Sequence, residues 1–269
     1  MKKFLLFFVF IGCISVNSLT QDIQDTTKTV GLLTVGNNID FFNKPYDHIL
    51  LVHPLGIGYK GANTTLIAYY NRGNLIQETP LITQTFKENQ FEVDFYHKIS
   101  NSTNYWINYA YSNSPHFPKY RIMGRAWQTL GSSDFRISGG GKYFYFDNGL
   151  LTTTFGLEKY FRNFWVEGKI YTYFKNPETR FSYQINSRLF WNDINYISLS
   201  LMSGAAQDEP WISYDVLHAS TAIVGVTSFI DKKHKSQIRA NVGYSIEEYY
   251  TDMRRNRFTG SISLTFYIF

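Results

Sequence analysis

The sequence predicts an all-β fold, an antiparallel transmembrane β-barrel. Three observations point to it: apolar and polar residues alternate from residue 89 to the end, the alternating segments are long, and aromatic residues are abundant. Successive side chains of a β-strand project to opposite faces, so such alternation gives one apolar and one polar face. Strands of about ten residues with these two faces are typical of outer-membrane barrels.

The alternation is clearest in residues 180–191. One phase is apolar and consists of Phe181, Tyr183, Ile185, Leu189 and Trp191, and the other is polar, with Arg180, Ser182, Gln184, Asn186 and Arg188. Residues 236–247 and 257–268 repeat the pattern. We expect Val242 and Leu264 to face lipid and Arg239 to face the interior.

Aromatic residues make up 18% of the chain, with 23 Phe, 21 Tyr and 5 Trp. Membrane barrels need such residues for the girdles at the two membrane interfaces. Beyond the N-terminal segment, no apolar run approaches the ~18 residues of a spanning helix. A secreted β-sandwich also alternates and is the alternative fold, but it leaves strand edges unpaired.

The first twenty residues form a signal peptide rather than part of the fold. Lys2 and Lys3 precede the apolar run 4–11, and small or polar residues follow it. Cleavage is expected between Ser18 and Gln21, which leaves residues 21–269 as a single barrel domain. The only cysteine, Cys13, lies inside this segment, so a chain cleaved after it has no disulfide and no cysteine-bound metal. Lipidation at Cys13 is the alternative.

The charge balance gives no reason to expect nucleic acid as a partner. The formal net charge is +5, and two of these charges are Lys2 and Lys3 of the signal peptide. No basic run exceeds Lys232-Lys233-His234-Lys235.

Fourteen segments have the length and pattern of strands, and twelve strands is the alternative because bacterial barrels have even strand numbers. The first three segments alternate less strictly, and Pro54 interrupts the second. Short polar turns are expected on one side, with longer loops at 74–85, 207–216 and 248–256 on the other. The predicted strands are 28–41, 46–60, 63–73, 86–98, 103–113, 118–130, 133–146, 150–160, 164–174, 180–191, 194–206, 217–229, 236–247 and 257–268.

The C-terminus carries an aromatic signature of the kind that outer-membrane assembly machinery recognises. The last residue is Phe269 and Tyr267 stands two residues before it, although the apolar phase runs through Ile268. We therefore expect this machinery and outer-membrane lipid as partners.

Several short stretches occur in an order that resembles the YaiO-type outer-membrane β-barrel family. They are Phe91-Glu92-Val93-Asp94-Phe95-Tyr96, Tyr109-Ala110-Tyr111-Ser112, Phe117-Pro118-Lys119-Tyr120, Ser138-Gly139-Gly140-Gly141-Lys142-Tyr143, Gly156-Leu157-Glu158-Lys159-Tyr160, and Ser203-Gly204 before Asp208-Glu209-Pro210. The resemblance covers roughly residues 30–269 and is most specific over 90–210. It implies an outer-membrane barrel associated with surface or exported polysaccharide, and it supplies no catalytic residues.

With the apolar phase outward, the polar phase lines a lumen rich in basic residues. Its acidic residues are Glu92, Asp94, Glu158, Glu167 and Glu247. A wall of one sign concentrates ions of the opposite sign, so a pore favouring anionic or sugar-like solutes is one interpretation. The alternative is a lumen plugged by Arg–Glu pairs. The predicted basic lumen residues are Arg72, Lys119, Arg121, Arg125, Arg136, Lys142, Lys169, Arg180, Arg188 and Arg239.

Seven aromatic residues share the inward phase. They could stack on sugar rings, but filling the lumen or lying near the interface is the more ordinary role. They are Tyr96, Trp106, Trp127, Trp165, Tyr171, Tyr173 and Tyr196.

An enzyme that acts on lipid is the competing class. It would need a serine and a histidine close together near the membrane surface, with an acid or amide orienting the histidine. The six histidines are His48, His53, His97, His116, His218 and His234, and the best local cluster is Ser112-Asn113-Ser114-Pro115-His116. It contains no recognised nucleophile motif. No metal-ligand spacing or cofactor motif is present either, so we expect no metal, no cofactor and no enzymatic activity.

The sequence therefore predicts a porin-like or envelope-associated barrel in a Gram-negative-type outer membrane. Two alternatives remain open: an outer-membrane hydrolase acting on lipid, and a closed structural or adhesive barrel.

Overall fold

The computed structural model describes residues 29–43, 48–78, 83–114, 116–131, 134–146, 149–175, 178–205, 216–249 and 254–268. Within these ranges the chain forms fourteen strands and no helix. The strands are β1 Val30–Phe42, β2 His48–Lys60, β3 Thr64–Glu78, β4 Thr83–Lys98, β5 Thr103–Ser112, β6 Tyr120–Thr129, β7 Phe135–Tyr145, β8 Gly149–Phe161, β9 Phe164–Lys175, β10 Glu178–Phe190, β11 Tyr196–Gly204, β12 Val216–Phe229, β13 Ser236–Tyr249 and β14 Arg254–Ile268.

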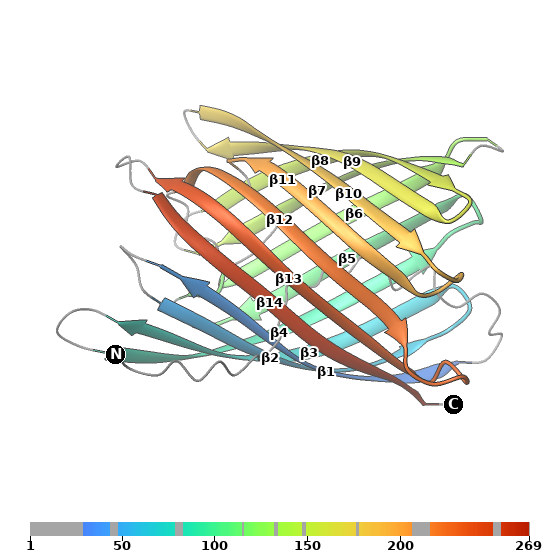
Figure 1. Ribbon diagram of the computed structural model, residues 1–269, viewed down its shortest axis with the longest axis horizontal. Coiled ribbons are helices and arrows are strands. Elements are labelled where there is room, and N and C mark those ends of the chain that lie inside the picture. Colours follow the sequence, from blue (N-terminus) through green and yellow to red (C-terminus); the bar gives the residue numbers. More distant parts are fainter. Residues whose placement is uncertain are drawn as a thin grey trace.

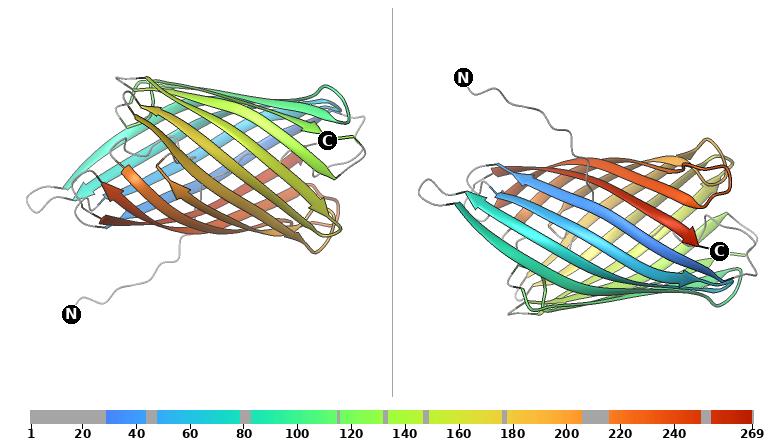
Figure 2. Two further views of the ribbon diagram at one scale, coloured as in Figure 1. Left: turned by 90° about the horizontal axis from the view of Figure 1, so that it is seen from above. Right: turned by 90° about the horizontal axis from the view of Figure 1, so that it is seen from below.

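Each strand pairs antiparallel with its neighbours in sequence, and β14 pairs with β1 to close the barrel (Figure 1). The two views of Figure 2 show the strands tilted around a single barrel. Closure runs from Gly31 opposite Ile268 to Phe42 opposite Arg257. No strand edge is therefore left open, as a membrane-spanning sheet requires. The predicted fold class, including fourteen rather than twelve strands, is confirmed.

The alternation read from the sequence separates the two faces of the sheet. Ile185 is 56% exposed and Val242 46% exposed on the outer face, whereas Arg188 is buried inside. On β14, Phe258, Ile268 and the side chains that alternate with them in the same phase face outward, and Arg257 and its phase face inward. The apolar surface therefore faces the membrane and the polar residues line the interior.

The two ends of the barrel differ in the connections that they carry. β1 begins and β14 ends at the rim that carries the short connections 61–63, 99–102 and 162–163, and the opposite rim carries the connections 113–119 and 205–215. Because barrels have short periplasmic turns and longer extracellular loops, we assign the first rim to the periplasm and the second to the cell exterior. Two of the predicted long loops were wrong, since β3, β4, β13 and β14 extend through most of 74–85 and 248–256.

Pro54 does not end β2. The strand continues through it, but the β1–β2 ladder omits Gly36 and Asn37 between the pairs Val35–Leu55 and Asn38–Val52. Proline has no N–H to donate, so the ladder is interrupted locally while the strand persists.

No helix in the described ranges is long and apolar enough to cross a membrane. The predicted signal peptide at 1–20 and the terminal Phe269 lie outside the described residues.

Candidate functional site: a basic interior cavity

Two apolar clusters fill the interior along β1–β4 and β14. Towards the periplasmic rim, Val30, Leu32 and Ile67 pack with Phe229 and Tyr267. Towards the extracellular rim, Leu50, Val52 and Leu75 pack against Phe117. Phe117 belongs to the connection 113–119, which therefore folds into the barrel mouth. We call the inward face of β1–β4 and β14 the packed side.

Buried acids on the packed side are paired. Asp94 accepts hydrogen bonds from Trp106 Nε1 at 2.7 Å and Asn108 Nδ2 at 2.9 Å. Arg121 Nη2 lies 2.6 Å from Glu92 Oε1. These contacts give Glu92 and one oxygen of Asp94 direct protein partners, whereas Asp94 Oδ2 is buried without a hydrogen-bond partner among the described residues.

A second buried network joins β13 to β14. Arg255 contacts Glu247 Oε2 through Nη2 at 2.5 Å and through Nε at 2.7 Å. Arg257 lies between Glu247 and Asp40, with closest N–O distances of 3.8 and 3.7 Å.

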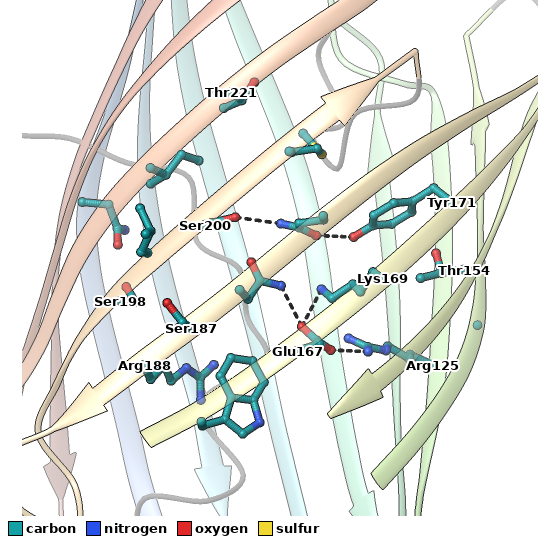
Figure 3. A pocket seen from close by; sticks show the side chains of 18 of the residues that line it. Arg125, Thr154, Glu167, Lys169, Tyr171, Ser187, Arg188, Ser198, Ser200 and Thr221 are labelled. Atoms are coloured by element: carbon teal, nitrogen blue, oxygen red, sulfur yellow. Dashed lines mark hydrogen bonds and ion pairs between the residues drawn. The ribbon is translucent and has the colours of Figure 1, made fainter. Parts of the chain in front are cut away.

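A cavity of about 170 Å³ lies along the other wall of the barrel, among inward residues of β5–β13. It is large enough for several ordered waters or one small solute. Much of its wall consists of glycine, serine and threonine, including Gly140 and Gly141. Ser198, Ser200 and Thr221 are seen in Figure 3. Small side chains leave the space that large ones fill on the packed side.

Glu167 is the centre of the polar network at this cavity. It pairs with Arg125, and its other oxygen contacts Lys169 Nζ at 3.2 Å and Asn186 Nδ2 at 2.7 Å (Figure 3). A hydrogen-bonded chain lies above it, in which Tyr171 donates to Gln184 and Gln184 donates to Ser200. Thr154 Oγ1 is buried and has no protein hydrogen-bond partner, so water or a solute must satisfy it.

Four residues lie between the cavity and a smaller space on its periplasmic side, and we call them the neck: Arg125, Trp165, Glu167 and Arg188. These residues line both the cavity and a smaller space of about 20 Å³ beside Asn104, Arg136 and Tyr160. The Arg188 guanidinium stacks on Trp165 at 4.4 Å and on Tyr196 at 4.9 Å. This stacking holds the positive charge of Arg188 in the neck.

Most of the charged residues in the cavity wall are basic. Among the described lining residues, five are basic and only Glu167 is acidic. The basic residues are Arg125, Lys142, Lys169, Arg188 and Arg239. A wall whose charges are mostly positive produces a positive potential in the cavity.

Eight of the ten predicted basic lumen residues face the interior, and five of these line the cavity. Arg121, Arg136 and Arg180 are the other three, placed by the inward phases of β6, β7 and β10.

Two of the ten were placed wrongly. Arg72 is exposed on the outer face of β3 between buried Asn71 and Gly73. Both phases of this strand contain apolar residues, and a shift of one residue reverses the facing of every side chain. Lys119 is exposed and lies before β6, outside the strands that form the lumen.

The seven aromatic residues predicted to face inward are all buried. Tyr96, Trp106 and Trp127 form one cluster, whereas Trp165, Tyr171 and Tyr196 border the cavity.

Several charged interior residues were missed by the sequence analysis. Arg255 falls in a segment predicted as a loop, although it has the same phase as Arg257 and Thr259. Asp40 and Glu88 are buried and were also omitted. Extending the alternation of the final strand backwards by two residues would have found Arg255.

The predicted cluster at Ser112 and His116 has a structural role. Ser112 Oγ donates to the carbonyl of Asn89 at 2.5 Å, and His116 Nδ1 lies 2.6 Å from Glu88 Oε1. His116 thus links the connection between β5 and β6 to β4, and Ser112 links the end of β5 to β4. Among the described residues, no group of histidine, cysteine or acidic residues could hold a metal ion.

Comparison with known proteins identifies the family. The YaiO membrane β-barrel domain matches residues 31–209, about two thirds of the chain. The chain belongs to the YaiO membrane β-barrel family. No curated protein matches the sequence significantly.

Solved structures similar to this YaiO-family barrel are outer-membrane channels and translocators. One is the ΔS2S3 mutant of TodX, a monoaromatic hydrocarbon channel, with a TM-score of 0.53 at 9% identity, covering 91% of each chain. Another is the translocator domain of the autotransporter NalP from Neisseria meningitidis, with a TM-score of 0.50 at 11% identity, covering 90% of this chain and 89% of that one. The anion-selective porin from Comamonas acidovorans matches with a TM-score of 0.46 at 8% identity, covering 90% and 99%. Family and fold together place the YaiO-family protein in the outer membrane as a barrel with porin- or channel-like structural neighbours.

Proposed function

We propose that this barrel is a narrow outer-membrane channel that binds small anionic or sugar-like solutes and serves surface or exported polysaccharide. The observation that carries the proposal is the cavity wall with five basic residues and one acidic residue. A solute with a carboxylate or phosphate would be concentrated there, because charged walls select ions of opposite sign.

The remaining lining chemistry supports the sugar-like part of the proposal. Trp165, Tyr171 and Tyr196 present aromatic surfaces beside hydroxyl and amide groups. Small-molecule sites combine apolar or aromatic walls with a few polar groups that fix orientation. The unsatisfied hydroxyl of Thr154 is one such group. No covalent chemistry is required of these residues, so we propose binding and passage without catalysis in the lumen.

The two apolar clusters favour a second candidate, a closed structural or adhesive barrel. Phe117 and its neighbours fill part of the extracellular mouth, and Val30, Ile67 and Phe229 fill part of the periplasmic one. In that case the cavity would hold water and the protein would act through its outer surface.

Conductance in planar bilayers under a KCl gradient distinguishes the channel from the closed barrel. If the barrel is this channel, the reversal potential should indicate anion selectivity, and galacturonate, an acidic sugar, should block the current at lower concentration than glucose. The double variant Arg125→Gln/Arg188→Gln should reduce the anion preference at least about twofold, because it removes two charges from the neck. Arg121→Gln is the matched control, since Arg121 pairs with Glu92 away from the cavity. A folded protein that does not conduct would favour the closed barrel, and cation selectivity would contradict the assignment of solute.

A further inference from the structure

A serine and a histidine lie side by side on the outer face of the barrel, near the extracellular rim. Ser203 is the penultimate residue of β11 and His218 is near the start of β12, and both are exposed. Ser203 Oγ is 3.1 Å from His218 Nε2. This is the contact through which a histidine takes the proton of a serine nucleophile.

The backbone is irregular on both sides of this contact. Gly204, directly after Ser203, has a φ of 134°, and a Cβ there would overlap the Cα of Ser182. The β12–β13 register shifts between Val216 and His218. Bulges and glycine-only conformations redirect side chains, and both are frequent beside active sites.

A carboxylate follows the histidine on the next strand. Glu248 of β13 is the register partner of His218 and shares its outward face. Glu248 Oε1 contacts Arg254 Nη2 of β14 at 2.7 Å. Serine, histidine, acid and arginine therefore succeed one another across four adjacent strands, β11–β14 (Figure 1).

A second histidine, His97, is also hydrogen-bonded to a hydroxyl side chain. His97 Nδ1 lies 2.9 Å from Thr64 Oγ1, but its register partner on β5 is Tyr105 and its ring stacks with Phe95. His53 bonds to the amide of Asn37. The combination of a primary hydroxyl, an imidazole and a neighbouring carboxylate is therefore found at Ser203, His218 and Glu248.

The surroundings of this trio are those of a membrane interface. Tyr183, the register partner of Ser203, is 56% exposed, and Leu201 is exposed two residues along the same face. Arg254 projects from the rim with a largely exposed side chain. Apolar groups below and a cation above fit a lipid with acyl chains and a phosphate headgroup.

We propose that Ser203, His218 and Glu248 form an esterase site that hydrolyses acyl esters of glycerophospholipids in the outer leaflet. Ser203 Oγ attacks the ester carbonyl while His218 Nε2 takes its proton; the C–O bond to glycerol then breaks, and that oxygen receives the proton. Water, deprotonated by the same imidazole, attacks the acyl-serine, releases a fatty acid and regenerates the serine. Glu248 orients the imidazole, and one water is consumed for each ester cleaved.

The test uses the complete mature protein in mixed micelles with phosphatidylglycerol, read as release of fatty acid and lysophospholipid. Ser203→Ala and His218→Gln should each reduce release by about a thousandfold or more. Glu248→Gln should lower the rate of release, whereas Glu248→Asp, which keeps the carboxylate, should retain most of it. A fluorophosphonate probe should label Ser203, and labelling should be lost in His218→Gln.

Matched controls lie on the same outer surface. Ser220, the register partner of Ser203 on β12, provides Ser220→Ala, and His97→Gln removes the other histidine bonded to a hydroxyl. An ether-linked phosphatidylglycerol should release nothing.

The proposal is overturned if the folded protein releases no fatty acid and takes up no label, or if release survives Ser203→Ala. It does not depend on conduction, because these residues lie outside the barrel. A protein that conducts without hydrolysing lipid refutes only the esterase, and the reverse result refutes only the channel.

Discussion

The packed side and the cavity side of this barrel are both built from antiparallel strands, but their inward side chains differ. On the packed side, β1–β4 and β14 contribute large apolar residues to two clusters, with Ile67 and Tyr267 in one and Leu50 in the other. On the cavity side, β5–β13 contribute glycine, serine and threonine beside long basic side chains. A closed sheet of fourteen strands fixes the outline of the lumen, but side-chain volume decides which part of it is open.

The difference also concerns charge. On the packed side, Asp94 accepts hydrogen bonds from Trp106 and Asn108, and Arg255 of β14 pairs with Glu247 on the adjoining strand β13. On the cavity side Glu167 is surrounded by Arg125, Lys169 and Asn186, and further bases line the space. The packed side thus has its acids in contact with protein donors, whereas the cavity wall carries five basic residues and one acidic residue.

The largest expected effect is a difference in the free energy of unfolding between a substitution on the packed side and one on the cavity side. Arg255→Gln removes the two-atom contact with Glu247, whose distance to Arg257 is 3.8 Å. We expect a loss of about 3–5 kcal/mol in the free energy of unfolding, because one partner of a buried ion pair is removed. Thr154→Val on the cavity side should change it by less than about 1 kcal/mol, since Thr154 Oγ1 has no protein partner. Urea unfolding in lipid vesicles measures both, and equal losses would remove the distinction between the walls.

A smaller effect is expected where the cavity wall is compared with the outer face. Val242→Arg places a charge against lipid near the middle of β13 and should cost about 2–4 kcal/mol if the residue lies near the membrane midplane. Asn241→Arg directs the same side chain into the cavity and should cost less than about 1 kcal/mol. Folding yield and urea midpoints of the two variants provide the measurement. A penalty at Asn241 as large as that at Val242 would mean that the cavity cannot admit a long side chain.

The smallest effect concerns the periplasmic turn between β12 and β13, where neither wall is involved. Backbone N–H groups of Lys235, Ser236 and Lys233 donate to the Asp231 carboxylate and lower the pKa of Asp231 from its ordinary value of 3.8. The ionised form is thus favoured in the folded state, so its stabilisation is present above 3.8 and is lost as the pH falls through the lower folded pKa. Asp231→Asn should be slightly less stable at neutral pH, and the difference in urea midpoint should shrink below about pH 4. A difference that grows in acid would contradict the assignment.

The sequence was sufficient to predict the outer face and the strand number, because lipid contact imposes a regular apolar phase on residues such as Ile185, Val242 and Phe258. It failed at Arg72, where Ile67 and Tyr69 face inward while Leu66 and Tyr70 face outward. When both phases are apolar, only the pairing with neighbouring strands decides the facing.

The cavity itself depends on contacts between residues far apart in the chain. Arg125 meets Glu167 across 42 positions, and Glu167 also lies near Lys169 and Asn186 from two strands. Composition indicated a basic lumen, but the position of the opening follows from which strands contribute small residues at one height. The contact between Ser203 and His218 was not predicted for a related reason. The two residues are 15 positions apart in the sequence, and only the β11–β12 pairing brings them together.

The seam between β1 and β14 bears on the order in which the barrel can form. Thr34 and Thr265 share a hydrogen bond across 231 positions, and Asp40 accepts one from Thr259 across 219. These contacts cannot exist until the final strand has been made, so every earlier intermediate is an open sheet with two free edges. Contacts of such long range slow folding, and unpaired edges invite pairing with other chains. The nascent chain therefore has to be kept apart from its copies for as long as the seam stays open.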